Sequence, residues 1–402
     1  MTAEPVTATR AATARTSTRY PEPMKCSLPL LAIPVFLLLS ACGGDDDSVP
    51  QDAASPGRDG ALPGRDSGSP IVDAGPMPDA GPMPDAGPMP DAGPMPDAGG
   101  GGGTLADDHP GDVGMGGDPA VVWFEDFEEG SLSAIAGRYD QSRDRGRWTL
   151  VSDTPNGSGS ALALRAGLGE NAVDLYKQLP DSDEWWVRWY ANYEAGVPWH
   201  HSGMWFGGYN PSMGWPSPSA GNRPNGDERF SISIEPVYGV SGSSPRFDYY
   251  NYWMGMHSWM AAPISDDGTA YYGNGLVHRN DFTVDPGTWV CLEVHVRLNT
   301  GAGSAAGAEL EVWKNDVLVR RFDESGPMGY WIRDKFCPTG ADGAECTDYP
   351  APATEVLDLQ FRNTTALRLN AFWPQNYITD AAEGTLIFDQ MVVATRRVGC
   401  IR

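Results

Sequence analysis

The stretch 288–299, TWVCLEVHVRLN, decides the fold class because apolar side chains alternate with others along it. Val290, Leu292, Val294 and Val296 fall on one side of an extended chain, and a period of two is typical of a strand with one buried face. The same alternation recurs in residues 184–193, 229–236, 308–313, 317–322, 366–373 and 384–395. Almost nothing in this region has a helical period. The sequence therefore predicts an all-β domain, an antiparallel β-sandwich, over residues 119–402.

Turn residues separate these expected strands. Gly, Pro, Asn and Asp lie between them, and these residues favour the backbone angles of tight turns. Between 308–313 and 317–322 the chain reads KND (Lys314–Asp316), a weaker form of the Asn-Gly signal. We expect a β-hairpin there.

The N-terminal residues have the pattern of an export signal. From Met24 the chain reads MKCSLPLLAIPVFLLLSAC, with one lysine, an apolar run and small residues before Cys42. Leu39–Cys42 resembles the lipobox of bacterial lipoproteins, which implies that Cys42 is lipidated and that residues 1–41 are upstream residues and signal peptide. A membrane-spanning helix is the alternative, but the run is short and contains Pro34. With Gly43 following the cysteine, we expect a lipid-anchored protein of the bacterial outer membrane, at the cell surface or its periplasmic face.

Residues 42–118 have the composition of a stalk. DAGPMP is repeated four times over 73–96 and is followed by a glycine run, and such a Pro- and Gly-rich segment cannot bury enough surface to fold. The whole chain has 53 acidic and 28 basic residues, a formal net charge of −25. Nucleic-acid binding needs concentrated Lys and Arg, so the charge excludes that class of partner.

Four cysteines remain after Cys26 and Cys42 are assigned to the signal and the lipid site. Cys337 and Cys346 are nine residues apart, a spacing that closes a loop, which leaves Cys291 to pair with Cys400. An exported domain favours such disulfides. A zinc site is the alternative, but no CxxC spacing supports it.

Two expected strands carry polar and aromatic residues on the face opposite their apolar side chains. The mixture suits a sugar, because pyranose C–H faces stack on aromatic rings while hydroxyl groups need fixed hydrogen-bond partners. The residues are Trp186, Arg188, Tyr190 and Asn192 in 184–193, and Ser231, Ser233 and Glu235 in 229–236.

Several stretches together resemble one family. GTWVCLEVHVRLNT, LEVWKNDVLV and the ending IFDQMVVATRRVGCI, with FEDFEEG and WWVRWYANYEAGVPWHHSGMWF, are similar to concanavalin A-like jelly rolls of the polysaccharide-lyase type. The similarity is greatest to the fungal cellulose-induced jelly-roll protein and its bacterial relatives, and it extends over most of 120–402. The family's last cysteine pairs with the one in its Trp-x-Cys-x-Glu strand, in agreement with Cys291–Cys400.

The resemblance implies a site for a uronate polymer. Lyases of this type cleave by β-elimination, which needs a group that neutralises the carboxylate, a base for the C5 proton and an acid for the leaving oxygen. A histidine after the aromatic strand matches His201 or His200. The acid–base tyrosine matches Tyr249, Tyr250 or Tyr252, and Arg188 or Arg246 could bind the carboxylate.

This chain also departs from the family pattern. Ser231 and Glu235 stand where relatives place an arginine and a glutamine, and a lysine near the histidines is absent. A carboxylate at Glu235 repels a uronate unless it is protonated. We therefore expect polysaccharide binding and leave cleavage open, with a structural or adhesion protein as the alternative.

The resemblance further implies a structural calcium ion and no organic cofactor. Its oxygen ligands would come from FEDFEEG and from the strand IFDQ near the C-terminus, namely Glu125, Asp126, Glu128 and Asp389.

Overall fold

The computed structural model describes residues 103–214, 220–237, 245–257, 271–332, 335–339, 355–379 and 383–402. The expected signal peptide, Cys42, the DAGPMP repeats and Cys346 lie outside these ranges. No helix in the described part is both long and apolar enough to cross a membrane.

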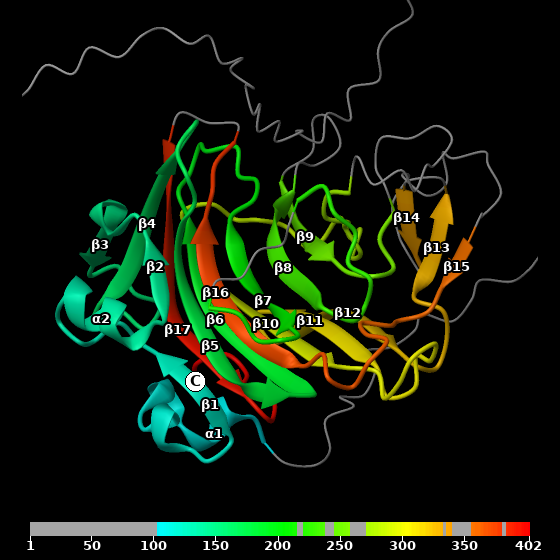
Figure 1. Cartoon of the computed structure of the whole chain (residues 1–402). Helices are drawn as coiled ribbons and strands as arrows, with labels where there is room; N and C mark the ends of the chain where they lie inside the picture. The colour runs from blue at the N-terminus through cyan, green and yellow to red at the C-terminus, as the bar shows by residue number, and fades with distance from the viewer. Residues whose placement is uncertain are drawn as a thin grey trace, which may run out of the picture. The chain divides into compact units, whose positions relative to one another are not determined.

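Two antiparallel sheets form the body of the described part (Figure 1). The larger sheet has eight strands in the order β12-β11-β10-β6-β17-β4-β3, with β1 also paired to β17. In that order the strands are Val317–Asp323, Glu309–Lys314, Val290–Arg297, Glu184–Tyr193, Glu383–Ala394, Ala161–Gly167 and Trp148–Val151, and β1 is Val121–Glu125. The smaller sheet has six strands in the order β2-β5-β16-β7-β8-β9. These are Gln141–Arg143, Val173–Ser182, Leu369–Asn376, Gly203–Tyr209, Arg229–Val237 and Arg246–Tyr252.

The remaining described elements are short. A three-stranded sheet has the order β14-β13-β15, with bounds Lys335–Pro338, Gly329–Ile332 and Glu355–Leu357. The two α-helices are α1 (Leu105–Asp108) and α2 (Leu132–Arg138). The 3-10 turns are η1 (Pro110–Asp112), η2 (Met115–Gly117) and η3 (Arg145–Arg147).

The hydrophobic core lies between the two large sheets. Trp185, Val187 and Trp189 of β6 are fully buried and belong to the same core cluster as Ile232 and Ile234 of β8. Along the chain β4, β6 and β17 belong to the larger sheet, while β5, β7 and β16 belong to the smaller one, so the chain crosses repeatedly between layers. The predicted antiparallel β-sandwich of the jelly-roll kind is confirmed.

The strands predicted from alternation are confirmed with small shifts at their ends. The prediction for 184–193 matches β6, and that for 288–299 contains β10. The KND hairpin is also confirmed, since Asn315 and Asp316 have φ angles of 50° and 65° and β11 pairs with β12 across them. Positive φ at both central residues is the requirement of the tight hairpin turn.

The folded region begins before the boundary expected at residue 119. Thr104 caps α1 in a capping box with Asp107, and the backbone N–H of Ala106 donates to Val398 O at 2.8 Å. Leu105 and Met115 are fully buried against Val392, Ala394 and Val398. Because of this packing, residues 104–118 belong to the folded domain and not to the expected stalk. The surrounding Gly, Asp and Pro residues gave no apolar pattern from which this could be predicted.

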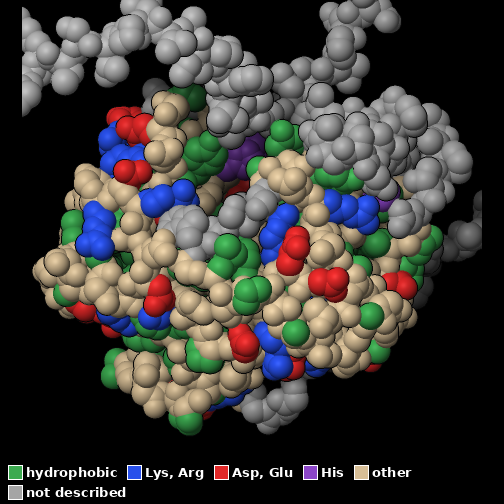
Figure 2. All heavy atoms as spheres, in the orientation of Figure 1, with side chains coloured by type: hydrophobic (Ala, Val, Ile, Leu, Met, Phe, Trp, Pro, Cys, Tyr) green, Lys and Arg blue, Asp and Glu red, His purple; other side chains and the backbone are tan. Residues whose placement is uncertain are grey.

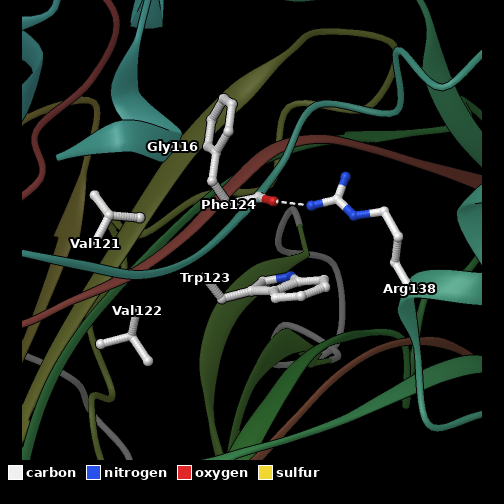
Figure 3. A pocket seen from close by; sticks show the side chains of 6 residues that line it. All are labelled: Gly116, Val121, Val122, Trp123, Phe124 and Arg138. Atoms are coloured by element: carbon white, nitrogen blue, oxygen red, sulfur yellow. Dashed lines mark hydrogen bonds between the residues drawn. The ribbon is translucent and has the colours of Figure 1, made fainter. Parts of the chain in front are cut away.

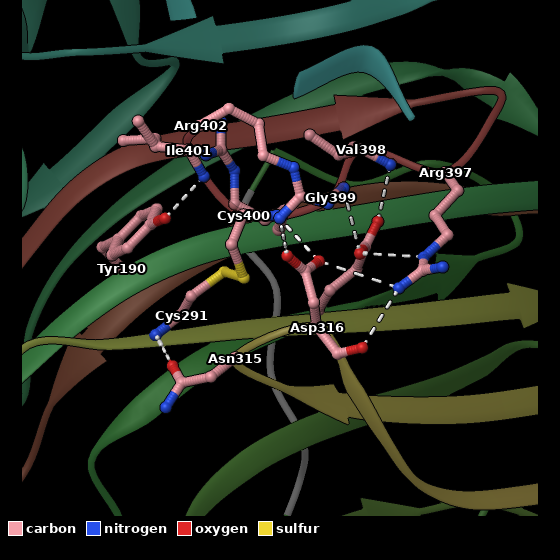
Figure 4. The surroundings of a disulfide bond; sticks show 12 residues. Tyr190, Cys291, Asn315, Asp316, Arg397, Val398, Gly399, Cys400, Ile401 and Arg402 are labelled. Carbon is pink, nitrogen blue, oxygen red and sulfur yellow. Dashed lines mark hydrogen bonds and ion pairs between the residues drawn. A yellow bond between two sulfur atoms is a disulfide. The ribbon is translucent and has the colours of Figure 1, made fainter. Parts of the chain in front are cut away.

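The C-terminal segment is fixed to the larger sheet by a disulfide bond (Figure 4). Cys291 of β10 is bonded to Cys400, as predicted. Glu293 lies two residues along β10, and its carboxylate accepts hydrogen bonds from the N–H groups of Val398 at 2.7 Å and Gly399 at 3.1 Å. The predicted partner of Cys337, Cys346, is outside the described residues.

Candidate functional site

The outer face of the six-stranded sheet carries aromatic and polar side chains in register. Trp373 of β16 pairs with Trp205 of β7, Trp205 with Ser233 of β8, and Ser233 with Tyr250 of β9, so one row crosses four strands. Since paired residues point to the same side of a sheet, this row and its neighbours form one surface. We call it the aromatic face and define it as Trp205, Ser231, Ser233, Glu235, Tyr250, Tyr252 and Trp373.

The rings of the aromatic face pack against one another. The rings of Trp205 and Trp373 stack with centroids 5.6 Å apart at 8°, and Trp205 also meets Tyr250 edge to face at 6.0 Å. Burial raises the pKa of the Tyr252 hydroxyl well above its usual value, so this group stays protonated and can donate a hydrogen bond. The hydroxyls of Tyr250 and Tyr252 lie 3.5 Å apart.

The loop between β6 and β7 brings two histidines to this face. The indole N–H of Trp199 donates to Glu194 O at 2.9 Å, and the hydroxyl of Tyr193 donates to Ser202 O at 3.2 Å. Ser202 Oγ in turn donates to Asn376 Oδ1 at 2.9 Å, which fastens the loop to β16. His201 has a φ of 61°, an uncommon conformation for a residue with a side chain, and it is held in place by these contacts.

His201, Glu235 and Tyr250 meet at one point. His201 Nδ1 lies 3.3 Å from Glu235 Oε1, and the rings of His201 and Tyr250 have centroids 4.9 Å apart. The His200 ring lies beside that of His201 at 3.6 Å. Glu235 is fully buried, whereas the His201 side chain is 13% exposed. Solvent therefore reaches this cluster through His201.

Two polar atoms of the aromatic face lack hydrogen-bond partners among the described residues. Ser231 Oγ and Trp205 Nε1 are both buried and unsatisfied. An unsatisfied buried polar group costs about 1–3 kcal/mol, so such groups are normally satisfied by water or a ligand. Unsatisfied indole nitrogens also occur in the core, at Trp185 and Trp189, and Trp205 and Trp373 are themselves only 3% and 2% exposed. The unsatisfied atoms therefore point to a ligand only together with their place on the outer side of the six-stranded sheet.

The structure corrects the placement of four predicted sugar-binding residues. Trp186, Arg188, Tyr190 and Asn192 lie on the outer face of the larger sheet, on the opposite side of the sandwich from Glu235. There Trp186 stacks on His295 at 4.0 Å, and Tyr190 accepts a hydrogen bond from Ile401 N at 2.7 Å. Asn192 donates to Asp153 at 3.2 Å, and Arg188 is paired with Asp112 in a fully buried ion pair. Of these residues, Arg188 and Tyr190 hold the N- and C-terminal segments on the sheet.

Tyr249 is also misplaced by the sequence interpretation. It is fully buried between the sheets, and its hydroxyl donates to the backbone O of Glu311 at 3.1 Å. Tyr250 and Tyr252 point to the other side of β9, where they belong to the aromatic face. Arg246 shares their side of β9 but pairs with Val237 at the far end of the strand.

The expected calcium ligands divide into two groups. Glu125 lies opposite Met391, two residues from Asp389 along β17. Its Oε1 accepts from Arg138 at 2.9 Å, and burial raises its pKa to about 7. Burial raises the pKa of Asp389 to about 8, and the negative charges of Glu128 and Asp126 add to the effect. Asp389 Oδ2 is buried without a hydrogen-bond partner among described residues. Among the described residues, the ligand atoms of Glu125, Asp126 and Glu129 lie within 4.8 Å of one another, and that group includes neither Glu128 nor Asp389. A calcium ion held by the four expected carboxylates stays a prediction.

A separate cleft of about 260 Å³ lies against β1 (Figure 3). Val121, Val122, Trp123 and Phe124 line it together with Gly116 and Arg138. The Arg138 guanidinium lies 4.8 Å from the Trp123 ring centroid and is bonded to Glu125, so the charge that lines this cleft is already paired. In the space-filling view acidic and basic side chains are interspersed, and a histidine is visible between hydrophobic side chains (Figure 2).

Sequence interpretation missed two members of the aromatic face. Trp205 and Trp373 were not among the predicted site residues, although alternation in GMWFGGY places Trp205 opposite the core residues Met204 and Phe206. That signal was present in the sequence. The pairing of β7 with β16, which sets Trp373 beside Trp205, joins residues far apart in the chain and has no local signal.

No protein-family model matches the chain, and no curated protein matches it. Solved structures similar to it include alginate lyase Aly36B, with a TM-score of 0.43 and 11% identity, covering 69% of this chain and 95% of that one. The marine alginate lyase from Aplysia kurodai has a TM-score of 0.44 and 15% identity, covering 68% and 99%. The cellulose induced protein Cip1 has a TM-score of 0.34 and 15% identity, and the match covers 69% of this chain and 99% of that one. This likeness concerns the fold and assigns no substrate to this chain.

Proposed function

We propose that this domain binds a polysaccharide on the aromatic face. The observation that carries the proposal is the combination, on one sheet face, of stacked indole rings with the unsatisfied Trp205 Nε1 and Ser231 Oγ. Rings supply the apolar contact for pyranose C–H groups, and the unsatisfied atoms supply hydrogen bonds to hydroxyls. A scaffold or adhesion role needs neither feature.

Cleavage of a uronate polymer is the reaction that the neighbouring residues suit. In β-elimination a base removes the C5 proton, the C4–C5 double bond forms, and the C4 oxygen leaves with a proton from an acid. His201 and Tyr250, with ring centroids 4.9 Å apart, supply a base and an acid. The reaction also needs positive charge at the uronate carboxylate, and the Glu235 carboxylate cannot provide it.

Two adjacent tyrosines give a matched test. Tyr250→Phe should weaken glycan binding by about three- to tenfold, the effect of one lost hydrogen bond, and change the free energy of unfolding by less than about 1 kcal/mol. Tyr249→Phe removes the hydroxyl that donates to Glu311 O in the core, so it should reduce stability by about 1 kcal/mol and leave binding unchanged.

A glycan array identifies the ligand, calorimetric titration measures its affinity, and ultraviolet absorbance of unsaturated products reports cleavage. Equal glycan affinities for the two variants, or no glycan bound by the wild type, would contradict the proposal. Binding without unsaturated products would retain the binding function and exclude the lyase reaction.

A further inference from the structure

The geometry points to a divalent metal site, of the zinc type, formed by His200, His201 and Glu235. Each residue offers one ligand atom, and these atoms lie within 4.8 Å of one another. Two imidazoles and one carboxylate are a common three-ligand set for a zinc ion that keeps a further position open. The inferred ion would sit at the edge of the aromatic face, where His201 is partly exposed.

The distance between His201 and Glu235 is compatible with a shared ion. His201 Nδ1 and Glu235 Oε1 are 3.3 Å apart, whereas charge-assisted N–H···O bonds are about 2.7–2.9 Å long. His295 forms a shorter pair with Glu184, at 2.7 Å, but its Nδ1 lies 3.3 Å from Glu311 Oε2, the same separation as between His201 and Glu235. The distance alone therefore does not distinguish the two clusters. Ligand bonds of about 2.0–2.2 Å in a tetrahedron place two ligand atoms about 3.3 Å apart. The observed separation of 3.3 Å agrees with two ligands on one ion, and the charges around each cluster decide between the clusters.

Glu235 has no lysine or arginine partner among the described residues. Its carboxylate is fully buried, and its hydrogen-bond partners there are His201 and the Ser233 hydroxyl, at 3.3 and 3.4 Å. Burying an ionised carboxylate is costly unless it is paired or coordinates a metal.

A second histidine–carboxylate cluster lies in the larger sheet and provides a contrast. His295, Glu309 and Glu311 also bring ligand atoms within 4.8 Å of one another. There Arg297 and Arg321 pair with Glu309 at 2.9 and 2.7 Å, so arginines already balance the carboxylates. No lysine or arginine of the described part pairs with Glu235, which is why only the first cluster needs a cation.

The loop that carries the histidines is held in a fixed position. Gln375 Nε2 donates to the backbone O of His201 at 3.3 Å, and Ser202 Oγ is bonded to Asn376. Gly203 follows, and a Cβ there would come 2.1 Å from Ile234 O, so only glycine lets β7 approach β8 this closely. Such supporting contacts orient ligands before an ion binds.

The ion gives Glu235 a role toward the polymer. A bound divalent cation would attract a uronate carboxylate to its open position and supply the positive charge that β-elimination requires. With His201 as a ligand, proton transfer would then fall to Tyr250 instead of His201. This role rests on the proposed function, whereas metal binding itself does not.

Zinc titration of the metal-free, full-length protein tests the site. We expect one equivalent bound by the wild type and by the control His295→Gln, and affinities lower by more than about tenfold in His201→Gln and Glu235→Gln. Cobalt substitution should give the visible absorption of a tetrahedral site in the first two proteins only. Thermal melting checks that each variant folds. If Glu235→Gln does not fold, the comparison between the wild type and His201→Gln tests the site, because the His201 side chain is partly exposed.

No zinc bound by the wild type, or equal binding by all four proteins, would overturn the inference. Glycan affinity is measured with and without zinc in parallel. A protein that binds zinc but no glycan rejects the proposed function and keeps the metal site. A protein that binds glycan but no zinc rejects the metal site alone.

Discussion

Arg188 shows why a charged residue on a strand need not belong to a binding site. Its side chain is fully buried, and Nη2 donates to Asp112 Oδ2 at 2.5 Å. Breaking a buried pair leaves the remaining charge without compensation, so Arg188→Met should lower the free energy of unfolding by about 3–5 kcal/mol. Glycan affinity of the folded protein should not change.

Urea unfolding of Arg188→Met and of the double variant Arg188→Met/Asp112→Asn measures this pair. The double variant should recover part of the loss, because the uncompensated carboxylate is gone. A stable Arg188→Met protein with reduced glycan affinity would instead support the carboxylate-binding role that the sequence had suggested.

Asp389 gives a pH-dependent prediction for the proposed calcium ion. Its folded-state pKa of about 8 lies above the value near 4 of an unfolded Asp, so the unfolded chain loses this proton first. The contribution of this carboxyl to the free energy of unfolding is therefore fully present below about pH 4 and is lost as the pH rises from about 4 to 8. Calcium, which binds the ionised carboxylate, should oppose that loss and raise the melting temperature more at pH 8 than at pH 5.

The variant Asp389→Asn isolates this carboxyl. Burial also raises the pKa of Glu125 to about 7 and of Asp174 to about 6, and both add pH dependence of the same sign. Scanning calorimetry at both pH values, with calcium or a calcium chelator, should show a flatter pH profile and no calcium effect in Asp389→Asn. An unchanged calcium effect would place the ion elsewhere.

At the scale of the elements, alternation predicts the faces of a strand but not the sheet to which the strand belongs. The apolar side of β6 was predicted correctly, since Trp185, Val187 and Trp189 are all buried. Its other side was grouped with Ser231 and Glu235, although β6 and β8 belong to different sheets. Period-two patterning is a local property, whereas sheet membership depends on pairing between distant segments. His201, Glu235 and Tyr250 could be predicted from the family resemblance; Trp373 beside Trp205 could not.

The disulfide bond makes a prediction for β10 and the C-terminal segment. Cys291 and Cys400 are 109 residues apart, and closing so long a loop restricts the unfolded chain strongly. Replacing both cysteines by serine should lower the free energy of unfolding by about 2–5 kcal/mol. Denaturant unfolding of the double variant and of the wild type with and without reductant measures the loss. A wild type whose stability does not respond to reductant would contradict it.

At the scale of the whole molecule, the first described residues lie beside the C-terminal segment that the disulfide bond joins to β10. Leu105 N and Ala106 N donate to Arg397 O and Val398 O at 3.1 and 2.8 Å, next to the bonded Cys400. Any tether that precedes Thr104 therefore joins the domain at its disulfide-bonded segment on the larger sheet. The aromatic face belongs to the other sheet, so Thr104 does not lie on that face.

This arrangement suits the proposed lipid anchor at Cys42. A Pro-rich spacer between Cys42 and Thr104 could extend on the order of 100 Å or more at about 3 Å per residue, far enough to present the domain to a large polymer. Cys42→Ser should move the protein from the membrane to the soluble fraction, because acyl chains rather than an apolar helix would hold it. Glycan affinity in solution should remain that of the wild type, since every residue of the aromatic face follows Thr104 in the chain. Cys26→Ser, a change within the same apolar segment, is the matched control and should leave anchoring intact. Fractionation that retains Cys42→Ser in the membrane would exclude the lipid anchor and favour the membrane-spanning helix that the sequence argued against.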